Sequence, residues 1–392
     1  MKSAENPTRS MTGVSVSRSG VRPIHVALFT TTFDVSGAER VLAHLALGLA
    51  ARNYRVSILG LQRRSGALET LLHGTNVVFR SFDVRTQWDP RPLWKLRRFL
   101  RDEHVDVLYT FLFHPLVIGR IVGRWAGVPL VLSSQQTMEW ERPHEVWLNR
   151  VTARWCDCVV AVSHNVQTYL EQKVHIPLEK LTTIYNCVDV AAFTPDQPVL
   201  PDRPHVATIG FAARLVPEKD FETLLQAFAR LAAERPGVRL RLAGDGPLRD
   251  KLQGSIASMG LSDRVELLGQ VENMVAFHRS LDVYVQSSHI EGLPCAVLEA
   301  MSTARPVVAT GVGGNADAVA EGVTGFLVPP RSPELMAERF ASLIDDPPLA
   351  RAMGDRGRER VLELFSAEGM VRNTEELIDR LRHRTLQTGV FM

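Results

Sequence analysis

The sequence predicts an α/β protein made of two doubly wound domains that face each other across a cleft. Short β-branched or apolar runs alternate with helical patterns of about 10–15 residues, which is typical of βα units in a parallel sheet. The alternation stops in a proline-rich stretch and restarts after it. A chain of 392 residues is also too long for one ordinary core and long enough for two.

The first half opens with residues 1–20, which contain no apolar segment of the kind that a signal peptide needs. We expect a disordered leader there and an N-terminal domain over 21–195. Strands and helices alternate through this domain, as a doubly wound sheet requires. The expected strands are 24–30, 55–61, 76–82, 105–111, 128–134, 156–163 and 180–186, and the expected helices are 38–53, 92–104, 115–127 and one from Asn165.

A proline-rich stretch with little periodicity separates the halves, and we place the linker at 196–205. The C-terminal domain is expected over 206–365, followed by a final helix within 366–392 that packs back on the N-terminal domain. In such folds ligands bind at the carboxyl ends of the strands. The expected strands are 206–215, 238–244, 264–270, 282–288 and 306–310, and the expected helices are 220–237, 247–260, 273–281 and 295–304, with the last helices running to about Arg384.

The composition is that of a soluble globular protein, with 45% hydrophobic and 22% charged residues. A formal net charge of +2 gives no support for nucleic acid as a partner. No run approaches the ~18 apolar residues of a membrane span. The cysteines Cys156, Cys158, Cys187 and Cys295 are scattered, so we expect reduced thiols in a cytoplasmic protein and no structural zinc site.

Two cations follow the first strand of the second half. Arg214 comes directly after that strand, and Lys219 stands just before the next helix. A helix N-terminus already favours anions, and a planar guanidinium beside an ammonium suits a diphosphate. The alternative is a pair of surface cations on an ordinary loop.

Two glutamates flank a Gly-Leu-Pro break in "HIEGLPCAVLEAM". Glu299 should lie on the second turn of a helix, where its carboxylate could accept hydrogen bonds from the vicinal diol of a ribose. A bare carboxylate among apolar neighbours would be costly without partners. Glu291 should lie in the loop nearer the cleft, where it could hold a hydroxyl of a second sugar or be a simple loop charge.

A glycine-rich turn follows a later strand in "PVVATGVGGNADAV". Gly311, Gly313 and Ala316 formally match a dinucleotide-binding pattern, but no acidic residue follows about 20 positions on. We therefore expect Gly313 and Gly314 to present backbone N–H groups to a ligand oxygen at close range.

Taken in order, "GFAARLVPEKDFETLLQAF", "LAGDGPL", "LLGQV", "SSHIEGLPCAVLEAMSTARPVVAT", "GVGG" and "GVTGFLVPP" resemble the donor half of GT-B glycosyltransferases, in particular the retaining family 4. The resemblance covers about residues 24–365 and implies two Rossmann-like domains. It also implies a nucleotide-diphosphate-sugar donor and no metal or other cofactor.

The resemblance further implies roles for individual residues. Lys219, Arg214 and Glu291 would be catalytic, with the two cations neutralising the diphosphate. The donor-binding set would be Arg214, Lys219, Glu291, Gly292, Leu293, Glu299, Gly313, Gly314 and Val271, with Glu299 on the ribose and Val271 near the base.

The implied reaction is transfer of the sugar to an acceptor hydroxyl with retention of anomeric configuration, by front-face attack with the leaving phosphate as base. Fixed cations and helix dipoles would stabilise the departing diphosphate. The acceptor would be a glycan, a lipid-linked or a small molecule in cell-surface polysaccharide or glycolipid assembly. Two alternatives stay open: a nucleotide-sugar 2-epimerase of the same fold, and a non-catalytic nucleotide-sugar-binding protein.

The first half carries fewer candidates. "FDVSGAERVLAHLALGLA" resembles the family's glycine-containing loop, in which Gly37 would let backbone approach the donor phosphate or the acceptor. Ser36 and Glu39 form a capping box, and helix capping alone would explain them. Where the family often has a histidine, this chain has Gln135 and Gln136, so Gln135 is our acceptor-side candidate.

The stretch 135–147 is expected to be an acceptor-facing loop, in which His144 or Glu141 could take part; an ordinary surface loop is the alternative. The basic amphipathic stretch 91–104 carries Trp94 and Phe99. It could rest on anionic lipid at the inner face of the cytoplasmic membrane. The alternative is that its apolar side packs on the sheet while the arginines are solvated.

Overall fold

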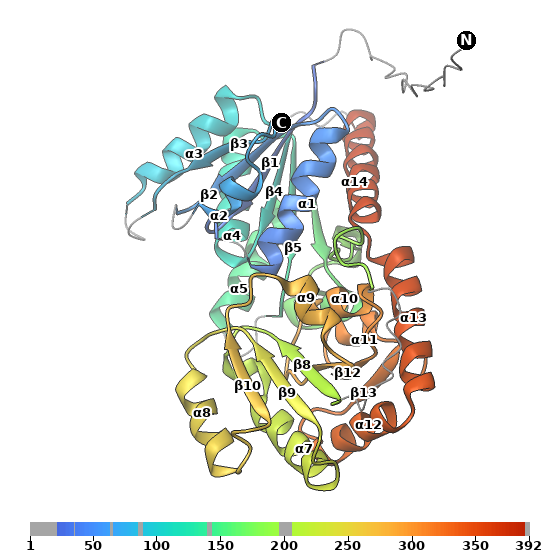
Figure 1. The fold of residues 1–392 in the computed structure, drawn as a ribbon. Helices are drawn as coiled ribbons and strands as arrows, with labels where there is room; N and C mark the ends of the chain where they lie inside the picture. Colours follow the sequence, from blue (N-terminus) through green and yellow to red (C-terminus); the bar gives the residue numbers. More distant parts are fainter. Residues whose placement is uncertain are drawn as a thin grey trace, which may run out of the picture.

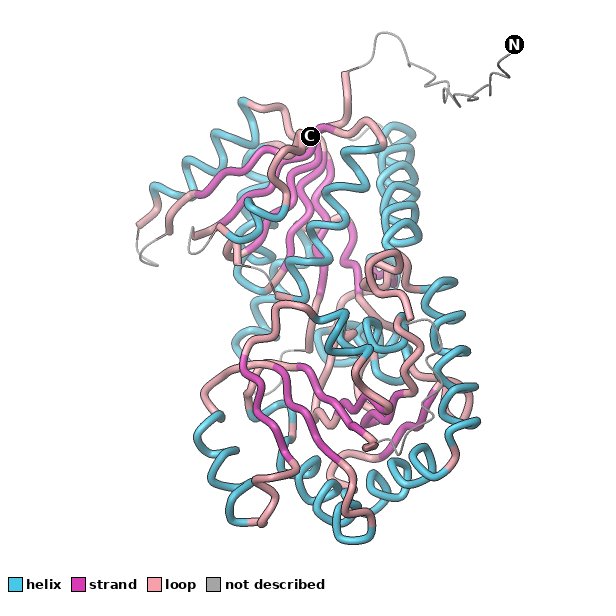
Figure 2. Tube along the Cα trace, in the orientation of Figure 1, coloured by secondary structure: helices cyan, strands magenta, loops and turns pink. Residues whose placement is uncertain are grey.

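The structure is a computed structural model that describes residues 22–34, 36–62, 66–84, 89–138, 143–195 and 206–388. The expected leader, the expected linker at 196–205 and the candidate Glu141 lie outside the described residues. Within this part of the chain, two parallel sheets form two domains, one above the other in Figures 1 and 2.

The N-terminal domain is built on a parallel sheet with the described strand order β3-β2-β1-β4-β5-β6-β7. The order reverses beside β1, between β1 and β4, which is the doubly wound arrangement predicted from the sequence. The strands are fully buried where they cross the centre of the domain, as parallel strands covered on both faces should be. They are β1 His25–Thr30, β2 Arg55–Gly60, β3 Val78–Ser81, β4 Val107–Phe111, β5 Leu130–Gln135, β6 Cys158–Ala161 and β7 Leu181–Thr183.

The C-terminal domain repeats this plan with the described strand order β10-β9-β8-β11-β12-β13. Its order reverses between β8 and β11, so the strands that precede Arg214 and Glu291 are neighbours. The strands are β8 Thr208–Ala212, β9 Arg239–Ala243, β10 Val265–Gly269, β11 Val283–Gln286, β12 Val307–Thr310 and β13 Gly325–Val328.

Helices cover both sheets. In the N-terminal half they are α1 Gly37–Ala51, α2 Ala67–Leu71, α3 Arg91–Asp102, α4 Phe113–Ala126, α5 Pro143–Thr152 and α6 His164–Tyr169. In the C-terminal half they are α7 Phe221–Glu234, α8 Arg249–Ser258, α9 Met274–Arg279, α10 Cys295–Ser302, α11 Asn315–Ala318, α12 Pro333–Asp345, α13 Pro347–Leu364 and α14 Ala367–Thr388.

Helix α5 corrects one expectation, because part of the stretch that we expected to be a loop is helical. The helix begins at Pro143, and proline is tolerated at the first helical position because the N–H that it lacks would have no partner there. His144 is exposed on this helix, and Trp147 is 60% exposed. The Trp, Glu and His residues of the stretch favoured a loop, and the short apolar periodicity of the helix was missed.

The last helix, α14, leaves the C-terminal domain and packs along α1 of the N-terminal domain (Figure 1). Val371, Leu377 and Ile378 are buried in the hydrophobic core of that domain. Gly48 of α1 lets the two helices approach, because a Cβ atom there would lie 2.3 Å from a methyl group of Val371. A second core cluster joins residues of β6 and α6 to the C-terminal domain, so the two domains are packed together.

No described helix has both the length and the apolar composition needed to cross a membrane.

Candidate active site

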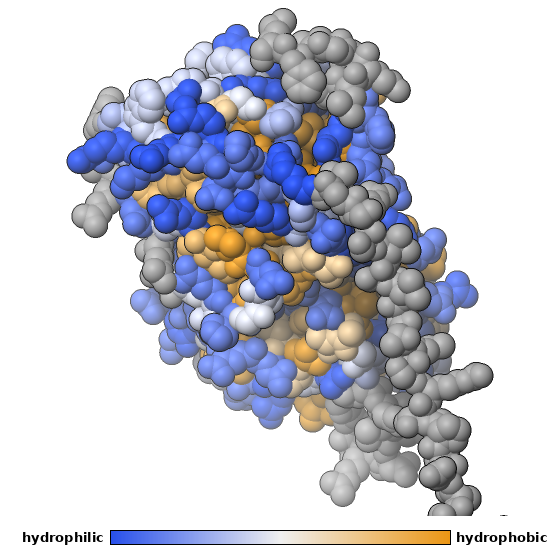
Figure 3. All heavy atoms as spheres, turned by 90° about the horizontal axis from the view of Figure 1, so that it is seen from above, coloured by the Kyte–Doolittle hydropathy of each residue, from blue (hydrophilic) through white to orange (hydrophobic). Residues whose placement is uncertain are grey.

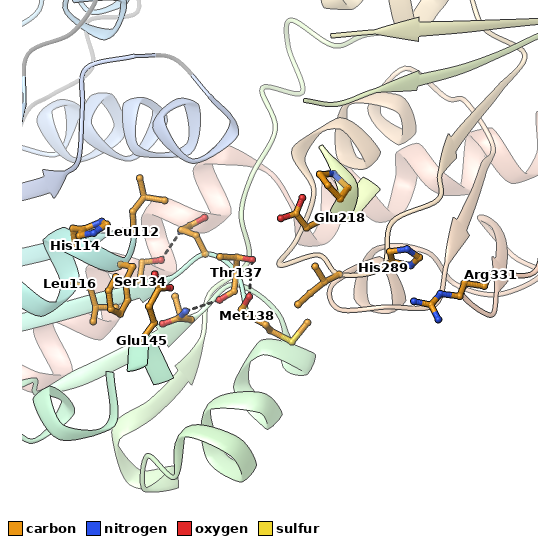
Figure 4. A pocket seen from close by; sticks show the side chains of 15 residues that line it. Leu112, His114, Leu116, Ser134, Thr137, Met138, Glu145, Glu218, His289 and Arg331 are labelled. Carbon is orange, nitrogen blue, oxygen red and sulfur yellow. Dashed lines mark hydrogen bonds between the residues drawn. The ribbon is translucent and has the colours of Figure 1, made fainter. Parts of the chain in front are cut away.

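The two sheets point their carboxyl ends at one cleft. A cavity of about 660 Å³ lies there, and its walls come from residues that follow β4 and β5 in the N-terminal domain and β8, β11 and β13 in the C-terminal domain. Figure 4 shows Glu218 and His289 of the C-terminal domain across from Thr137 and Met138 of the N-terminal domain. The residues that line this cavity are Leu112, Phe113, His114, Leu116, Ser134, Gln135, Gln136, Thr137, Met138, Glu145, Pro217, Glu218, His289, Ile290 and Arg331.

Next to this cavity, the structure brings two of the predicted catalytic residues into contact. Lys219 closes a short 3₁₀ turn before α7, and Glu291 lies in the loop between β11 and α10. The Lys219 Nζ atom lies 2.6 Å from Oε1 of Glu291, and the side chains are 20% and 8% exposed. An ion pair this close to the edge of a cleft places a cation at the carboxyl end of the sheet, where phosphate binding is favoured.

The carboxylate of Glu291 is held by neutral donors as well. Gln286 Nε2 and Ser288 Oγ each donate to Oε1 over 2.5 Å, and the Tyr284 hydroxyl donates to Gln286 Oε1 over 3.0 Å. Gln286 and Ser288 were not predicted from the sequence, although the polar residues at the end of the strand "VYVQSS" were the signal that could have found them. Together these residues fix the Glu291 carboxylate without help from a ligand.

The glycines of the site allow backbone segments to touch. A Cβ atom on Gly313, where φ is +49°, would lie 1.8 Å from the carbonyl oxygen of Glu291. A Cβ atom on Gly292 would lie 1.9 Å from the carbonyl oxygen of Gln136 in the other domain. The expectation for Gly314 was wrong, since its N–H donates to Gly292 O over 2.7 Å and therefore does not face a ligand. Close packing explains Gly314, whereas the role expected of the Gly313 N–H stays a prediction.

Glu299 lies on the second turn of α10, as predicted, and its carboxylate is only 9% exposed. His278 Nε2 of α9 lies 3.2 Å from its Oε2 atom. The guanidinium of Arg40, on α1 of the N-terminal domain, lies 3.6 Å from its Oε1 atom. The partners that a buried carboxylate requires are therefore present, and neither was identified from the sequence.

Tyr284 connects the two carboxylates. Its hydroxyl reaches Glu291 through Gln286, and its ring packs against the ring of His278 with centroids 5.3 Å apart. The same hydroxyl lies 3.3 Å from the carbonyl oxygen of Ala212, two residues before Arg214. Glu291 and Glu299 are thus each linked to one buried tyrosine through a single intervening side chain, and Arg214 begins the loop beside it.

The remaining donor-binding candidates lie around this centre in different environments. Arg214 is exposed, and no acidic side chain among the described residues forms an ion pair with it. Val271 follows β10 and is partly buried against the core of the domain. Leu293 is 4% exposed, so its side chain belongs to the hydrophobic core, while its carbonyl oxygen accepts a hydrogen bond from Asn186 Nδ2 over 3.3 Å.

In the N-terminal domain, Gly37 begins α1 and lies against the N-terminus of α10. The Cys295 Sγ atom lies 3.7 Å from the carbonyl oxygen of Gly37. Burial, with the Glu299 carboxylate nearby, raises the pKa of the Cys295 thiol to about 12. The predicted capping box is absent, because the Ser36 hydroxyl donates to the Glu39 carboxylate instead of accepting from a backbone N–H.

Gln135 lines the cavity but its amide is used within the domain. Its Nε2 atom donates to Thr137 O over 2.6 Å, and its Oε1 atom accepts from Asn149 Nδ2 over 2.9 Å. Asn149 in turn accepts from the buried guanidinium of Arg120 over 2.8 Å. The stretch after β5 is thereby fixed by residues of α4 and α5 that sequence analysis did not connect to it.

Residues of α6 form a second set of contacts between the two domains. His164 Nδ1 lies 2.8 Å from Asp317 Oδ1 of α11, and the neighbouring Asn165 Nδ2 donates to the carbonyl oxygen of Gly313 over 2.8 Å. The glycine turn that touches Glu291 is therefore held from the N-terminal domain as well. In the part of the chain that is described, no three His, Cys, Asp or Glu side chains are grouped as metal ligands would be.

Comparison with known proteins identifies the family. Residues 196–360 match the family Glycosyl transferases group 1, and residues 35–192 match Glycosyltransferase Family 4. The chain belongs to this glycosyltransferase family. It is 31% identical over 296 residues to the alpha-D-kanosaminyltransferase of Streptomyces kanamyceticus, a match that covers 67% of this chain and 75% of that relative.

Two further matches place this glycosyltransferase among its relatives. An exopolysaccharide phosphotransferase of Streptomyces coelicolor is 33% identical over 230 residues, which is 58% of this chain but only 24% of that protein. The crystal structure of Anabaena HepE in complex with UDP-glucose superposes with a TM-score of 0.81 at 22% identity, covering 91% of this chain and 100% of the other. This likeness confirms the predicted GT-B fold of two Rossmann-like domains.

Proposed function

We propose that this glycosyltransferase moves a sugar from a nucleoside diphosphate sugar to an acceptor hydroxyl with retention of anomeric configuration. The observation that carries the proposal is the Lys219–Glu291 ion pair, 2.6 Å long, at the carboxyl end of the sheet beside the interdomain cavity. Arg214 adds an exposed cation at the end of β8. Two cations beside a carboxylate suit a ligand that joins a diphosphate to a polyhydroxyl ring.

The reaction breaks the bond between the anomeric carbon and the diphosphate oxygen, so negative charge develops on the diphosphate. Lys219 and Arg214 stabilise that charge, and fixed charges of this kind are typically the largest catalytic contribution. The acceptor hydroxyl forms the new bond on the same face, and its proton passes to the departing phosphate oxygen. Glu291, fixed by Gln286 and Ser288, orients the donor sugar, and Glu299 binds the ribose.

Because these cations can neutralise the diphosphate, the proposed reaction requires no metal ion. The acceptor would occupy the 660 Å³ cavity, whose walls carry polar and apolar side chains from both domains. The names of the similar proteins suggest where to begin: HepE binds UDP-glucose, and the relative from Streptomyces coelicolor is an exopolysaccharide enzyme. A uridine-linked donor and an acceptor from cell-surface polysaccharide or glycolipid assembly in the cytoplasm are the first to test.

The test is a turnover assay with UDP-, GDP-, ADP- and TDP-sugars, with products followed by NMR in the presence and absence of EDTA. We expect one donor to give an α-product from an α-donor, at a rate that EDTA leaves unchanged. An inverted product would contradict retention, and loss of activity with EDTA would contradict metal independence. Conversion of the donor to its epimer in the absence of an acceptor would favour the nucleotide-sugar 2-epimerase. Donor binding without any turnover would favour the non-catalytic nucleotide-sugar-binding protein.

We also propose a peripheral membrane contact through the outer surface of α3 and α4. Trp94 and Trp125 are 55% and 44% exposed, and their rings meet edge to face with centroids 4.5 Å apart. The Arg97 guanidinium lies 4.6 Å from the Trp125 ring. Seen from above in Figure 3, the left margin over α3 is strongly hydrophilic. Exposed tryptophans among arginines suit the boundary of an anionic bilayer.

Sedimentation with vesicles tests this contact. Vesicles of phosphatidylglycerol and phosphatidylcholine should carry down the wild type, and the double variant Trp94→Ala/Trp125→Ala should lose most of that binding. Trp147→Ala, which removes a tryptophan 60% exposed on α5, is the matched control and should bind like the wild type. Equal binding by all three proteins would contradict the assignment of this surface.

A further inference from the structure

The two oxygens of Glu299 are held in different ways. Oε2 faces His278, a side chain with no exposed surface, at 3.2 Å from Nε2. Oε1 faces Arg40 of the other domain at 3.6 Å, and that arginine is 42% exposed. Because ion pairs with an exposed partner are weak, a ligand hydroxyl can compete for Oε1. The contact with His278 lies inside the protein and stays in place.

Packing alone does not explain a histidine at position 278. Its ring is surrounded by the aromatic rings of Tyr284, Phe277 and Phe193, with centroids 5.3 to 6.0 Å away. Its Nδ1 atom is buried and has no hydrogen-bond partner among the described residues. A buried polar atom without a partner lowers stability, so an apolar aromatic residue would pack here at less cost. The Nε2 atom must therefore supply the reason for the histidine.

The hydrogen-bonding chemistry of the pair determines its arrangement. A carboxylate can only accept hydrogen bonds, so the proton of the pair is on Nε2 of His278. That N–H fixes Oε2 of Glu299 and with it the plane of the carboxylate.

We propose that His278 is a positioning residue that makes the site selective for ribose. By holding Oε2 it keeps the carboxylate of Glu299 in the orientation that presents Oε1 to the ribose hydroxyls, which displace Arg40. The inference rests on the proposed function, in which Glu299 binds the ribose of the donor. It assigns the discrimination between ribose and deoxyribose to a residue that the nucleotide never touches.

The experiment measures dissociation constants by calorimetry for a nucleoside diphosphate and its 2′-deoxy analogue. The base is chosen by thermal shift of the wild type with UDP, GDP and ADP. We expect the wild type to prefer the ribonucleotide by about tenfold or more, as a hydrogen bond to a charged group allows. In His278→Phe that ratio should fall below about threefold, while His278→Gln, whose amide can donate to Oε2, should keep most of it.

Phe277→Leu is the matched control, because it loosens the same aromatic cluster without touching Glu299. We expect it to lower the melting temperature and to leave the ratio unchanged. If His278→Phe does not fold, His278→Leu and Glu299→Gln make the same comparison. If a folded apolar variant keeps the wild-type ratio of dissociation constants, the inference about His278 is wrong and the proposed function is unaffected. If the wild type binds none of the nucleotides, the proposed function is wrong as well.

Discussion

The two faces of the cleft differ in kind. On the C-terminal face, charged side chains meet one another: Lys219 pairs with Glu291, and Glu299 contacts His278. On the N-terminal face, the polar groups near the cavity are mostly neutral, and Gln135 accepts a hydrogen bond from Asn149. A face rich in fixed charge suits a charged ligand such as a diphosphate, and a face of neutral polar and apolar groups suits an acceptor. We therefore expect donor and acceptor recognition to be divided between the two domains.

The largest effect should follow from removing the cation on the charged face. We expect Lys219→Ala to lower kcat/KM by about 10²–10³-fold, because it removes the charge nearest the departing diphosphate. The measurement is steady-state kinetics with a saturating acceptor. Lys251→Ala, which removes an exposed lysine on α8, is the control and should behave like the wild type. Equal kcat/KM values for the two variants would contradict the assignment of donor binding to the C-terminal face.

A smaller effect is expected where the faces touch. Gly292→Ala would place a Cβ atom 1.9 Å from the Gln136 carbonyl oxygen, so the loop of Glu291 must move away from the other domain. We expect a loss of about 1–3 kcal/mol in the free energy of unfolding, together with weaker donor binding. Gly254→Ala meets no atom within 4 Å and is the control. It should be neutral or stabilise α8 by up to about 1 kcal/mol.

The neutral face can be weakened separately. Asn149→Ala removes the hydrogen bonds to Gln135 and Arg120, and we expect it to lower the free energy of unfolding by about 1–3 kcal/mol. Because the C-terminal face is unaffected, the dissociation constant of the donor should match that of the wild type while the KM of the acceptor rises. Calorimetry with donor and kinetics with varied acceptor make the two measurements. A higher dissociation constant for the donor with an unchanged KM for the acceptor would reverse the assignment of the two faces.

The smallest expected effect is chemical. The pKa of the Cys295 thiol is raised to about 12, mainly by burial, so almost no thiolate forms at pH 8. We expect iodoacetamide to modify Cys295 of the folded protein much more slowly than the same residue in urea, as measured by mass spectrometry of its peptide. Comparable rates in the two states would show that the contact between Gly37 and Cys295 is open in solution.

The sequence predicted the fold and one side of the site because both depend on contiguous patterns. Alternating strands and helices produce the two doubly wound sheets, and Lys219, Glu291 and Glu299 each stand where a strand ends or a helix begins. The carboxyl ends of adjacent parallel strands meet at one edge, so these residues had to lie close together.

The partners of these residues could not be predicted in the same way. Arg40 and His278 reach Glu299 from α1 and α9, and the distance between helices depends on packing that no local pattern encodes. The same holds for Asn149, which fixes Gln135 from a helix whose first turn we expected to be part of a loop. Gly314 was misinterpreted because a glycine required for close packing and one required for ligand approach have the same sequence pattern.

Hydrogen exchange with and without the nucleoside diphosphate chosen by thermal shift tests the central claim most directly. If the C-terminal face binds the donor, peptides covering 213–221 and 288–299 should exchange more slowly with the nucleotide, while those covering 130–138 change little. Protection confined to the N-terminal domain, with 213–221 and 288–299 unaffected, would contradict the account.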